Sequence, residues 1–541
     1  MKDGKLSPGR WLTLEQEALK LKTNEKTLID LTAYQGIALW WFTRFRLFNP
    51  AKSTKWVRGL TRNTYMFSLA DFMYDFSTLI ICRMISRFLR KNTDRTKPTV
   101  LMTVNDRDWK SLRDPTGGSR KGDIFFQSLI YELQKRGFRI VTTTPLRSPI
   151  AGLKTMIDRL KHQQQNLIHR EFNTYWSMKI SKMEYEAKKY FRNSWRNASK
   201  NETFMKSLEK SGFEKELPYY FNSIFGYVAK CLEIAKKMVT EEKPSLILVN
   251  SEHGIIQKSL LVAGKLEKIP TIALQHGTIG HIHKGYLSWK GSISESGIIK
   301  SPYCPIPDKT AVFGPYYFDL LTKTSAYPPN SVVVTGQPRY DALVTADKVY
   351  SKESFCKSLN LDPAKKIALV ATENVPIPDG KAFLTSVLRS LRSFPELQIV
   401  VKPHPAEKGE WYKEVVKEEN IKAVVLSKDA DTYEALYSCD LFLADFSTVV
   451  LEAIVLRKTG VTLHLSKGQD PTPYFRGVTL RVYREEDLAP AIRKALYDED
   501  EIKKLKKARE RFVQEHAYTQ DGRATERIAN IIEEMTQKRQ I

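Results

Sequence analysis

Short runs of hydrophobic residues, each followed directly by a polar motif, recur through the second half of the chain. Four such runs, which have the length of buried strands, lie at residues 271–273, 332–335, 397–401 and 441–444. The motifs after them are Leu-Gln-His-Gly (274–277), Gly-Gln-Pro-Arg (336–339), Lys-Pro-His-Pro (402–405) and Asp-Phe-Ser-Thr (445–448). Open parallel sheets bind ligands beyond the carboxyl ends of their strands, so the motifs predict a cleft between two sheets. Their polar character favours an enzyme with a phosphate-bearing substrate.

The alternation of hydrophobic runs with helical stretches predicts the fold class. It forms two series separated near residues 345–365, which indicates an α/β protein with two Rossmann-like domains facing across a cleft. A basic helical region precedes them, and a helical insertion interrupts the first. The expected boundaries are 1–97 for the N-terminal region, 98–345 for the first domain with its insertion at 151–240, 346–520 for the second domain, and 521–541 for a C-terminal helix.

The charge of the chain is concentrated at its N-terminal end. Of the net charge of +25 over 541 residues, residues 1–240 carry +22, from 44 Lys and Arg against 22 Asp and Glu. The remainder has 42 basic and 39 acidic residues, so it is nearly neutral. Such an excess indicates an anionic partner, for example a membrane surface or a nucleic acid.

Two amphipathic stretches in the first hundred residues sharpen that choice. Helical spacing would align Ile37, Trp41, Phe45 and Phe48 on one face, and Met73, Phe76, Ile80 and Met84 on another. Aromatic, apolar and basic residues together are typical of a helix lying in the headgroup layer of an anionic membrane. Packing of these side chains against the main fold is the alternative, and the pattern leaves both open.

The five cysteines bear on the compartment. They are scattered, with no Cys-x-x-Cys pair, which argues against a disulfide framework and a zinc site and favours a reducing cytosol. No signal-peptide pattern opens the chain, and no apolar run reaches the roughly 20 residues that span a bilayer. We therefore expect a cytoplasmic protein at the inner face of the cell membrane.

The motif at residues 402–405 has the clearest chemistry. Lys402 and His404 leave a very apolar strand, and two prolines fix the backbone direction there. A cationic amine and an imidazole suit a phosphate or a departing nucleotide.

In the motif at residues 445–448, Ser447 and Thr448 open a helix. Hydroxyls at this position are ordinary caps, but the free amides of such a helix start also bind anions. Glu452, one turn further, is a candidate contact to a nucleoside.

The first domain supplies the candidates for a general base. His276 follows one strand, and Glu252 follows the preceding strand; either could remove a proton from a hydroxyl group, and the sequence does not rank them. His281 and His283 lie close by, but no neighbouring carboxylate or cysteine completes a usual metal set, so we expect no metal.

Two further residues are assigned less sharply. Arg339 could reach a phosphate or could act in the domain hinge, and Glu373 lies in a loop that would cover a nucleotide or form a plain surface turn. Dinucleotide, Walker and Gly-x-Ser-x-Gly motifs are absent from the sequence.

Taken in order, these motifs resemble the two-Rossmann-domain glycosyltransferases known as GT-B. The closest likeness is to capsule polysaccharide synthesis proteins and to CDP-glycerol glycerophosphotransferases that polymerise teichoic acid. It spans about residues 244–530 and is carried by the motifs at 269–271, 275–277, 307–310, 336–341, 402–405 and 447–448.

The resemblance implies transfer of a nucleotide-activated sugar or polyol phosphate to a surface-glycan or lipid-linked acceptor, without a bound metal or cofactor. It implies that Lys402, His404, Ser447 and Thr448 hold the donor phosphates, that Glu452 holds the nucleoside, and that His276 acts near the acceptor. The His-Pro pair is similar to that of CMP-sugar enzymes, which favours a CMP- or CDP-linked donor over UDP. Gln275 departs from the tryptophan typical of the teichoic-acid group, which leaves glycerophosphate as the transferred group open.

The sequence thus predicts a peripheral membrane glycosyltransferase. The first alternative is an enzyme like UDP-N-acetylglucosamine 2-epimerase, which cleaves the same type of bond without an acceptor. The second is a nucleic-acid-binding protein, although no recognised nucleic-acid motif is present and we expect no such partner. The oligomeric state does not follow from the sequence.

Overall fold

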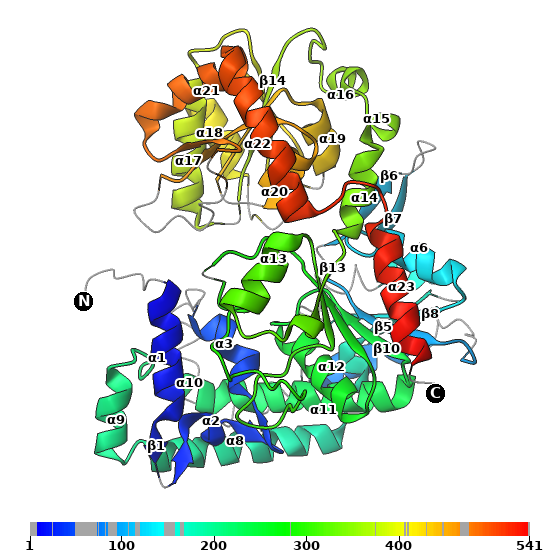
Figure 1. The fold of residues 1–541 in the computed structure, drawn as a ribbon, viewed down its shortest axis with the longest axis vertical. Helices are drawn as coiled ribbons and strands as arrows, with labels where there is room; N and C mark the ends of the chain where they lie inside the picture. The colour runs from blue at the N-terminus through cyan, green and yellow to red at the C-terminus, as the bar shows by residue number, and fades with distance from the viewer. Residues whose placement is uncertain are drawn as a thin grey trace.

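A computed structural model describes most of the chain. The described residues are 8–23, 25–48, 73, 75–81, 83–84, 95–105, 108–113, 119–144, 157–162, 167–281, 283–373, 375–404, 407, 410–428, 430–445, 448–465, 475 and 477–538. Two parallel β-sheets organise them, and Figure 1 shows the two as separate layers stacked along the long axis of the molecule. The predicted fold class, with two Rossmann-like domains, is confirmed.

The first sheet has seven strands. They are β5 (Thr99–Thr103), β8 (Arg139–Thr144), β9 (Leu167–Glu171), β10 (Leu246–Val249), β11 (Thr271–Leu274), β12 (Lys309–Val312) and β13 (Val332–Val334). Their spatial order is β13-β12-β11-β10-β5-β8-β9, and every neighbouring pair is parallel. The order reverses between β5 and β10, which is the switch point where such sheets bind ligands.

The second sheet has six parallel strands. They are β14 (Ile367–Ala371), β15 (Gln398–Lys402), β16 (Ala423–Val425), β17 (Leu441–Ala444), β18 (Thr459–Leu463) and β19 (Leu480–Val482). Their order, β16-β15-β14-β17-β18-β19, is the Rossmann order with its switch point between β14 and β17. The central strands are buried along their whole length because helices cover both faces of the sheet, and their sequences are therefore continuous apolar runs.

Helices cover both sheets. In the first domain and its insertion these are α6 (Gln127–Lys135), α8 (Met178–Ala198), α9 (Glu202–Glu209), α10 (Leu217–Tyr219), α11 (Phe225–Glu242), α12 (Ile255–Leu266), α13 (Pro315–Asp319) and α14 (Pro338–Val344). The second domain adds α15 (Ala346–Val349), α16 (Lys352–Ser358), α17 (Ile377–Leu391), α18 (Trp411–Glu418), α19 (Thr432–Ser438), α20 (Thr448–Val455), α21 (Leu488–Tyr497) and α22 (Glu499–Ala517).

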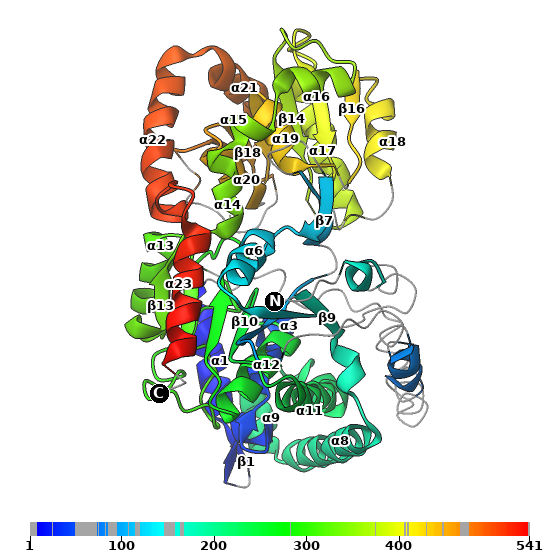
Figure 2. The ribbon, with the colours of Figure 1, turned by 90° about the vertical axis from the view of Figure 1, so that its right-hand side faces the viewer.

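The last helix, α23 (Ala524–Gln537), returns to the first domain, as Figures 1 and 2 show. Ile528, Ala529 and Ile532 lie in the same hydrophobic core as strands of the first sheet. Asp341 fixes the start of the helix, because its carboxylate accepts hydrogen bonds from the amides of Ala524 (3.0 Å) and Thr525 (2.8 Å). The chain therefore crosses between the domains twice.

The N-terminal segment packs on the first domain. It contains α1 (Pro8–Lys20), α2 (Leu28–Leu31) and α3 (Trp40–Phe48), with two-residue strands β1 (Lys22–Thr23), β2 (Lys26–Thr27), β3 (Ala33–Tyr34) and β4 (Ile37–Ala38) between them. Ile37 and Trp41 are buried, and the Trp41 indole N–H donates to the carbonyl of Pro302 at 3.0 Å. For this first amphipathic stretch the structure therefore shows packing on the main fold. The side chain of Phe48 is outside the described part.

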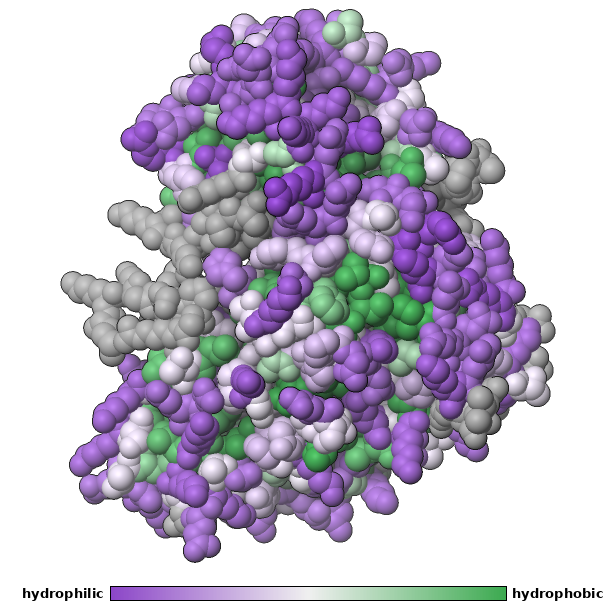
Figure 3. Space-filling view, viewed as in Figure 1, coloured by the Kyte–Doolittle hydropathy of each residue, from purple (hydrophilic) through white to green (hydrophobic). Residues whose placement is uncertain are grey.

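On the face drawn in Figure 3, hydrophilic side chains cover most of the second domain along α22. Within the described ranges, no helix combines the length and the hydrophobicity needed to span a bilayer.

Candidate functional site

The carboxyl edge of the first sheet carries a cluster of three histidines. His276 follows β11, and its ring centroid is 5.2 Å from that of His253, which follows β10. His283 completes the cluster, 5.3 Å from His253. Tyr286 lies against both His253 (5.4 Å) and His283 (5.0 Å). The predicted candidate His276 is thus one member of a larger imidazole group.

The environment of the cluster keeps the imidazoles of His253 and His283 neutral. Burial, together with the neighbouring His276 and His283, lowers the pKa of His253 well below its usual value. Burial also lowers the pKa of His283 to about 4. Phe45 from α3 packs on the rings of His253 (4.6 Å) and His283 (5.5 Å), so the N-terminal segment forms one wall. Imidazoles with so low a pKa are weak bases at neutral pH, so His253 and His283 are suited to hydrogen bonding and to shaping the site around His276.

Glu252, the second candidate base, lies inside the protein. It is fully buried and accepts hydrogen bonds from the hydroxyls of Thr310 (2.8 Å) and Tyr327. Burial raises the pKa of its carboxyl group, with Lys258 opposing that effect. In this geometry Glu252 fastens β10 to β12 beneath the histidine cluster.

Gln275 fixes the backbone that presents His276. Its side-chain amide donates to the carbonyl of Gly277 (2.7 Å) and accepts from the amide of Phe313 (2.9 Å). Its own carbonyl accepts from Gln337 (3.4 Å). The buried Gln275 therefore links the carboxyl ends of β11 and β12 through its side chain and reaches the segment after β13 through its backbone carbonyl.

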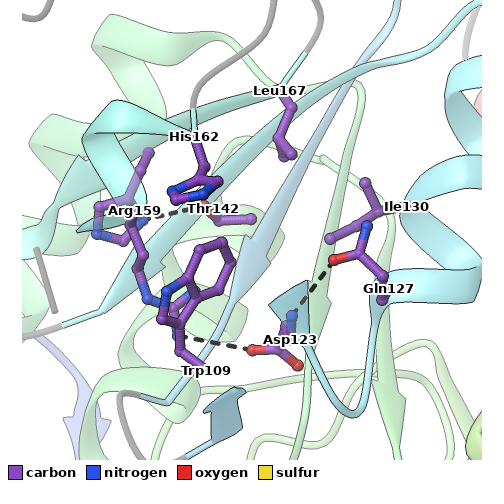
Figure 4. Close-up of a pocket in the computed structure, with 9 residues that line it drawn as sticks. Trp109, Asp123, Gln127, Ile130, Thr142, Arg159, His162 and Leu167 are labelled. Carbon is purple, nitrogen blue, oxygen red and sulfur yellow. Dashed lines mark hydrogen bonds and ion pairs between the residues drawn. The ribbon is translucent and has the colours of Figure 1, made fainter. Parts of the chain in front are cut away.

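A pocket lies in the same domain, lined by residues of β8, β9 and α6 among others (Figure 4). The hairpin β6 (Trp109–Arg113) and β7 (Ser119–Asp123) supplies Trp109 and Asp123 to its lining. The guanidinium of Arg159 lies 4.6 Å from the centre of the Trp109 ring and 3.7 Å from Asp123 Oδ2. Asp123 Oδ2 and Arg159 Nε are buried and have no hydrogen-bond partner among the residues that the structure describes.

Burial changes the protonation of two carboxyl groups in and beside this pocket. It raises the pKa of Asp123 to about 7, with Arg159 opposing the rise, and it raises the pKa of Glu171 to about 8. His169 bridges Thr142 (3.0 Å) and Glu171 (3.1 Å). Carboxyl groups that titrate near neutrality, beside a guanidinium and an indole, suit a ligand that carries hydroxyl groups.

In the second domain, the loop after β15 is a turn held by hydrogen bonds to side chains. His404 lies at its tip, and its backbone amide donates to Glu407 Oε2 (2.9 Å). The same carboxylate oxygen accepts from the Thr372 hydroxyl at 2.5 Å. Lys402 is buried, and its amine donates to the carbonyls of Pro403 (2.8 Å) and Lys428 (2.9 Å). In this conformation Lys402 supports the loop, while the imidazole of His404 is partly exposed.

The edge near β17 carries a second charged group. Arg481 Nη1 donates to the carbonyl of Asp445 (2.8 Å), and His464 Nδ1 lies 3.6 Å from the Asp445 carboxylate. Ser447 lies outside the described residues, as does the side chain of Thr448, whose backbone begins α20. Glu373 is buried directly after β14.

Arg339 and Glu452 are brought together. The guanidinium of Arg339, at the start of α14, forms a buried ion pair with the carboxylate of Glu452 on α20. Arg339 also lies over the ring of Phe125, at 4.6 Å. Glu452 raises the pKa of the Arg339 guanidinium, which stays charged. The pair joins the carboxyl edges of the two sheets.

Several residues of these sites were missed by sequence reasoning. They are His253, Asp123, Arg159, Glu407, His464 and Arg481. Only His253 had a signal, because it follows a predicted strand within residues 250–254, as His276 follows the next. Within the part of the chain that the structure describes, no three His, Cys, Asp or Glu side chains are grouped to hold a metal ion.

A model of the UDP-N-acetylglucosamine 2-epimerase family matches residues 319–533. This range runs from the last residue of α13 into α23 and covers less than half of the chain. It contains the whole second sheet but, of the first sheet, only β13, so the histidine cluster lies outside it. No curated protein sequence matches the chain.

Similar solved structures include the UDP-N-acetylglucosamine 2-epimerase from Neisseria meningitidis bound to UDP-GlcNAc, with 13% identity over 82% of this chain and 100% of that one and a TM-score of 0.49. A glycosyltransferase from Rickettsia africae has 13% identity over 81% and 98%, with a TM-score of 0.46. The wall teichoic acid polymerase TagF with CDPG has 12% identity over 88% and 98%, with a TM-score of 0.46. The strand orders of this chain, rather than these low identities, define its two-domain architecture.

Proposed function

We propose that this protein is a glycosyltransferase that moves a sugar, or a polyol phosphate, from a nucleotide-activated donor to a surface-glycan or lipid-linked acceptor. The observation that carries the proposal is the pairing of Arg339 with Glu452, which holds the carboxyl edges of two Rossmann sheets against each other. Each domain carries groups suited to one substrate: neutral imidazoles and a polar pocket in the first, and the His404 turn and the start of α20 in the second.

The donor is assigned to the second domain. His404, Lys402, Ser447, Thr448 and Arg339 are proposed to contact its phosphates, and the start of α20 adds backbone amides. Glu452 and Glu373 are proposed to contact the nucleoside. Since Arg339 and Glu452 are paired here, donor binding would exchange part of that pair for substrate contacts.

The identity of the donor nucleotide is to be decided by comparing the binding of different nucleotides. The His-Pro pair favours a CMP- or CDP-linked donor, whereas the matching family model names UDP-N-acetylglucosamine. Cationic and amide groups would stabilise the departing nucleotide, so the proposed reaction uses neither a metal nor a cofactor.

The acceptor is assigned to the first domain. We propose that the pocket of Asp123 and Arg159 holds acceptor hydroxyls and that His276 takes the proton from the attacking one. The acceptor oxygen forms a bond to the donor carbon or phosphorus, and the bond from that atom to the nucleotide phosphate oxygen breaks. The electron pair leaves with the nucleotide, and the proton remains on His276.

An epimerase is the second candidate, because the family model matched over residues 319–533 is that of a UDP-N-acetylglucosamine 2-epimerase.

A cytoplasmic location at the inner membrane face also remains a proposal. The four described cysteines are free and buried, which agrees with a reducing compartment.

Thermal-shift measurements with CMP, CDP, UDP and GDP and their sugar conjugates test the donor site. We expect one nucleotide to stabilise the wild type and not His404→Ala, while Glu410→Ala, an exposed change nearby, behaves as the wild type. Product analysis with that donor then separates the candidates: a sugar altered without an acceptor indicates an epimerase, and nucleotide release that needs added glycan indicates a transferase. Stabilisation by no nucleotide would overturn both.

A further inference from the structure

The second amphipathic stretch of the N-terminal region exposes its apolar side and buries polar residues. Residues 75–81 are helical, as are residues 73, 83 and 84. Its large apolar side chains are exposed: Met73 by 56%, Phe76 by 42%, Ile80 by 41% and Met84 by 58%. They recur every three or four residues, so they form one continuous stripe along the helix. In Figure 2 this short blue helix lies at the outer edge of the first domain.

The buried side of the same helix is polar and fixed in place. Asp75 is buried and forms an ion pair with Lys230 of α11 at 2.8 Å. Lys230 also lies 3.5 Å from Glu184 of α8. Thr78 and Leu79 are buried beside them. Removing Asp75 from this network would leave Lys230 buried with one fewer partner, which is costly, so the helix cannot roll to hide its apolar stripe.

The charge around the stripe is positive. Arg83 is exposed and lies on the stripe, seven residues after Phe76. Residues 51–100 contain 10 Lys and Arg against 3 Asp and Glu. An exposed row of methionine, phenylalanine and isoleucine that carries an exposed arginine, within a basic stretch of sequence, is complementary to a surface that is apolar inside and anionic outside.

We propose that the stripe formed by Met73, Phe76, Ile80 and Met84 docks the protein on an anionic lipid surface. The apolar side chains enter the boundary between headgroups and acyl chains, and Arg83 contacts the lipid phosphates. A nucleic acid would use the positive charge but would gain nothing from the apolar row, and a second copy of the chain would bring like charges together. The inference does not depend on the proposed transfer reaction.

Vesicle flotation of the full chain tests it, with phosphatidylcholine vesicles and with vesicles containing 30 mol% phosphatidylglycerol as roughly representative anionic membranes. We expect binding to the anionic vesicles to fall at least about tenfold in Ile80→Ser/Met84→Ser, since each side chain loses its burial in lipid. Leu266→Ser/Ile298→Ser is the matched control, because these side chains have similar exposure (46% and 49%) elsewhere on the surface. It should bind as the wild type does.

Each outcome bears on the proposal. Equal binding by Ile80→Ser/Met84→Ser and the wild type would overturn it, as would equal loss in the control. Equal binding to neutral and anionic vesicles would overturn the role of charge. If RNA displaced the protein from the vesicles, and both variants still bound that RNA, the positive region would be assigned to nucleic acid. Thermal unfolding of both variants checks that they are folded. Because no donor is present, failure here leaves the nucleotide experiment unaffected.

Discussion

Arg339, just beyond the last strand of the first sheet, forms a buried ion pair with Glu452 on the helix that follows β17 of the second sheet. The two residues link the candidate acceptor and donor edges directly. Phe125 covers the guanidinium from the first domain, at 4.6 Å. A charge pair with an aromatic cover, placed between two domains, couples the stability of the protein to the arrangement of its domains.

Removing one member of this pair should destabilise the protein strongly. Arg339→Met leaves the Glu452 carboxylate buried without its partner, and we expect a loss of about 3–5 kcal/mol in the free energy of unfolding. The double variant Arg339→Met/Glu452→Met should recover most of that loss. Denaturant unfolding measures both. Lys352→Ala, which breaks a more exposed pair with Asp440, should cost no more than about 1 kcal/mol, and an equal cost for the two single variants would contradict the argument.

Gly336 is required for the return of the C-terminal helix. Its φ is +78°, and a Cβ there would lie 3.1 Å from the Cβ of Ala524 and 3.3 Å from Nη2 of Arg527. Gly336→Ala should therefore lose more stability than Gly212→Ala, where φ is +77° but no atom lies within 4 Å. The strained φ alone costs about 1–2 kcal/mol, and the crowding against α23 adds to it. Urea unfolding of both variants gives the comparison, and equal losses would show that α23 adapts.

The sheets were predictable because their strands are buried on both faces. The run at 397–401, for example, corresponds to β15 (Gln398–Lys402), since a central parallel strand has no solvent face to encode. The positions of the motifs at strand ends followed from the same reasoning. Contacts between segments distant in the sequence could not be predicted in this way. Nothing local indicates that Arg159 lies beside Trp109, or that the Lys402 amine turns to the carbonyl of Lys428.

The two amphipathic stretches show the same limit. Helical spacing identified the shared face of the second stretch, but in the first stretch it was wrong for Ile37, which lies in β4 and not in α3. In neither stretch could it give the direction in which the apolar residues point. Ile37 and Trp41 pack inward, whereas Ile80 and Met84 point outward. The difference arises from a buried partner for Asp75 that lies 155 residues away, at Lys230.

Glu407 should control nucleotide binding through His404. Its carboxylate holds both the Thr372 hydroxyl and the His404 amide, so Glu407→Ala releases the turn that presents the imidazole. We expect the affinity for the donor nucleotide to fall roughly tenfold, which corresponds to about 1.4 kcal/mol, as measured by isothermal titration. Thr372→Val should act in the same direction, and Glu410→Ala should have no effect. Unchanged nucleotide affinity in Glu407→Ala would show that the turn is not part of the donor site.

Asp123 should influence the acceptor and not the donor. Burial raises the pKa of its carboxyl group to about 7, so it accepts a hydrogen bond from an acceptor hydroxyl more strongly as the pH rises through 7. Asp123→Asn can still hold the turn before α6, because an amide oxygen can also accept from the amides of Phe125 and Phe126. Kinetics with varied acceptor should show a higher KM and no inflection near pH 7, with unchanged donor KM. A change in donor KM alone would place the pocket outside the acceptor path.

The partly buried histidines of the cluster predict how stability depends on pH. Burial lowers the pKa of His283 to about 4, below the value of about 6.5 in an unfolded chain, so the unfolded state binds more protons between these values. Stability contributed by a neutral His283 is therefore complete above pH 6.5 and is lost as the pH falls toward 4, by up to about 1.4 kcal/mol per pH unit. His283→Asn, which retains an acceptor for the Gly285 amide, should flatten this slope in denaturant unfolding between pH 4.5 and 7. His162→Asn, an exposed change, should leave the slope as it is. An identical slope in His283→Asn and wild type would mean that the His283 imidazole binds protons equally in the folded and unfolded states, which would contradict the lowered pKa.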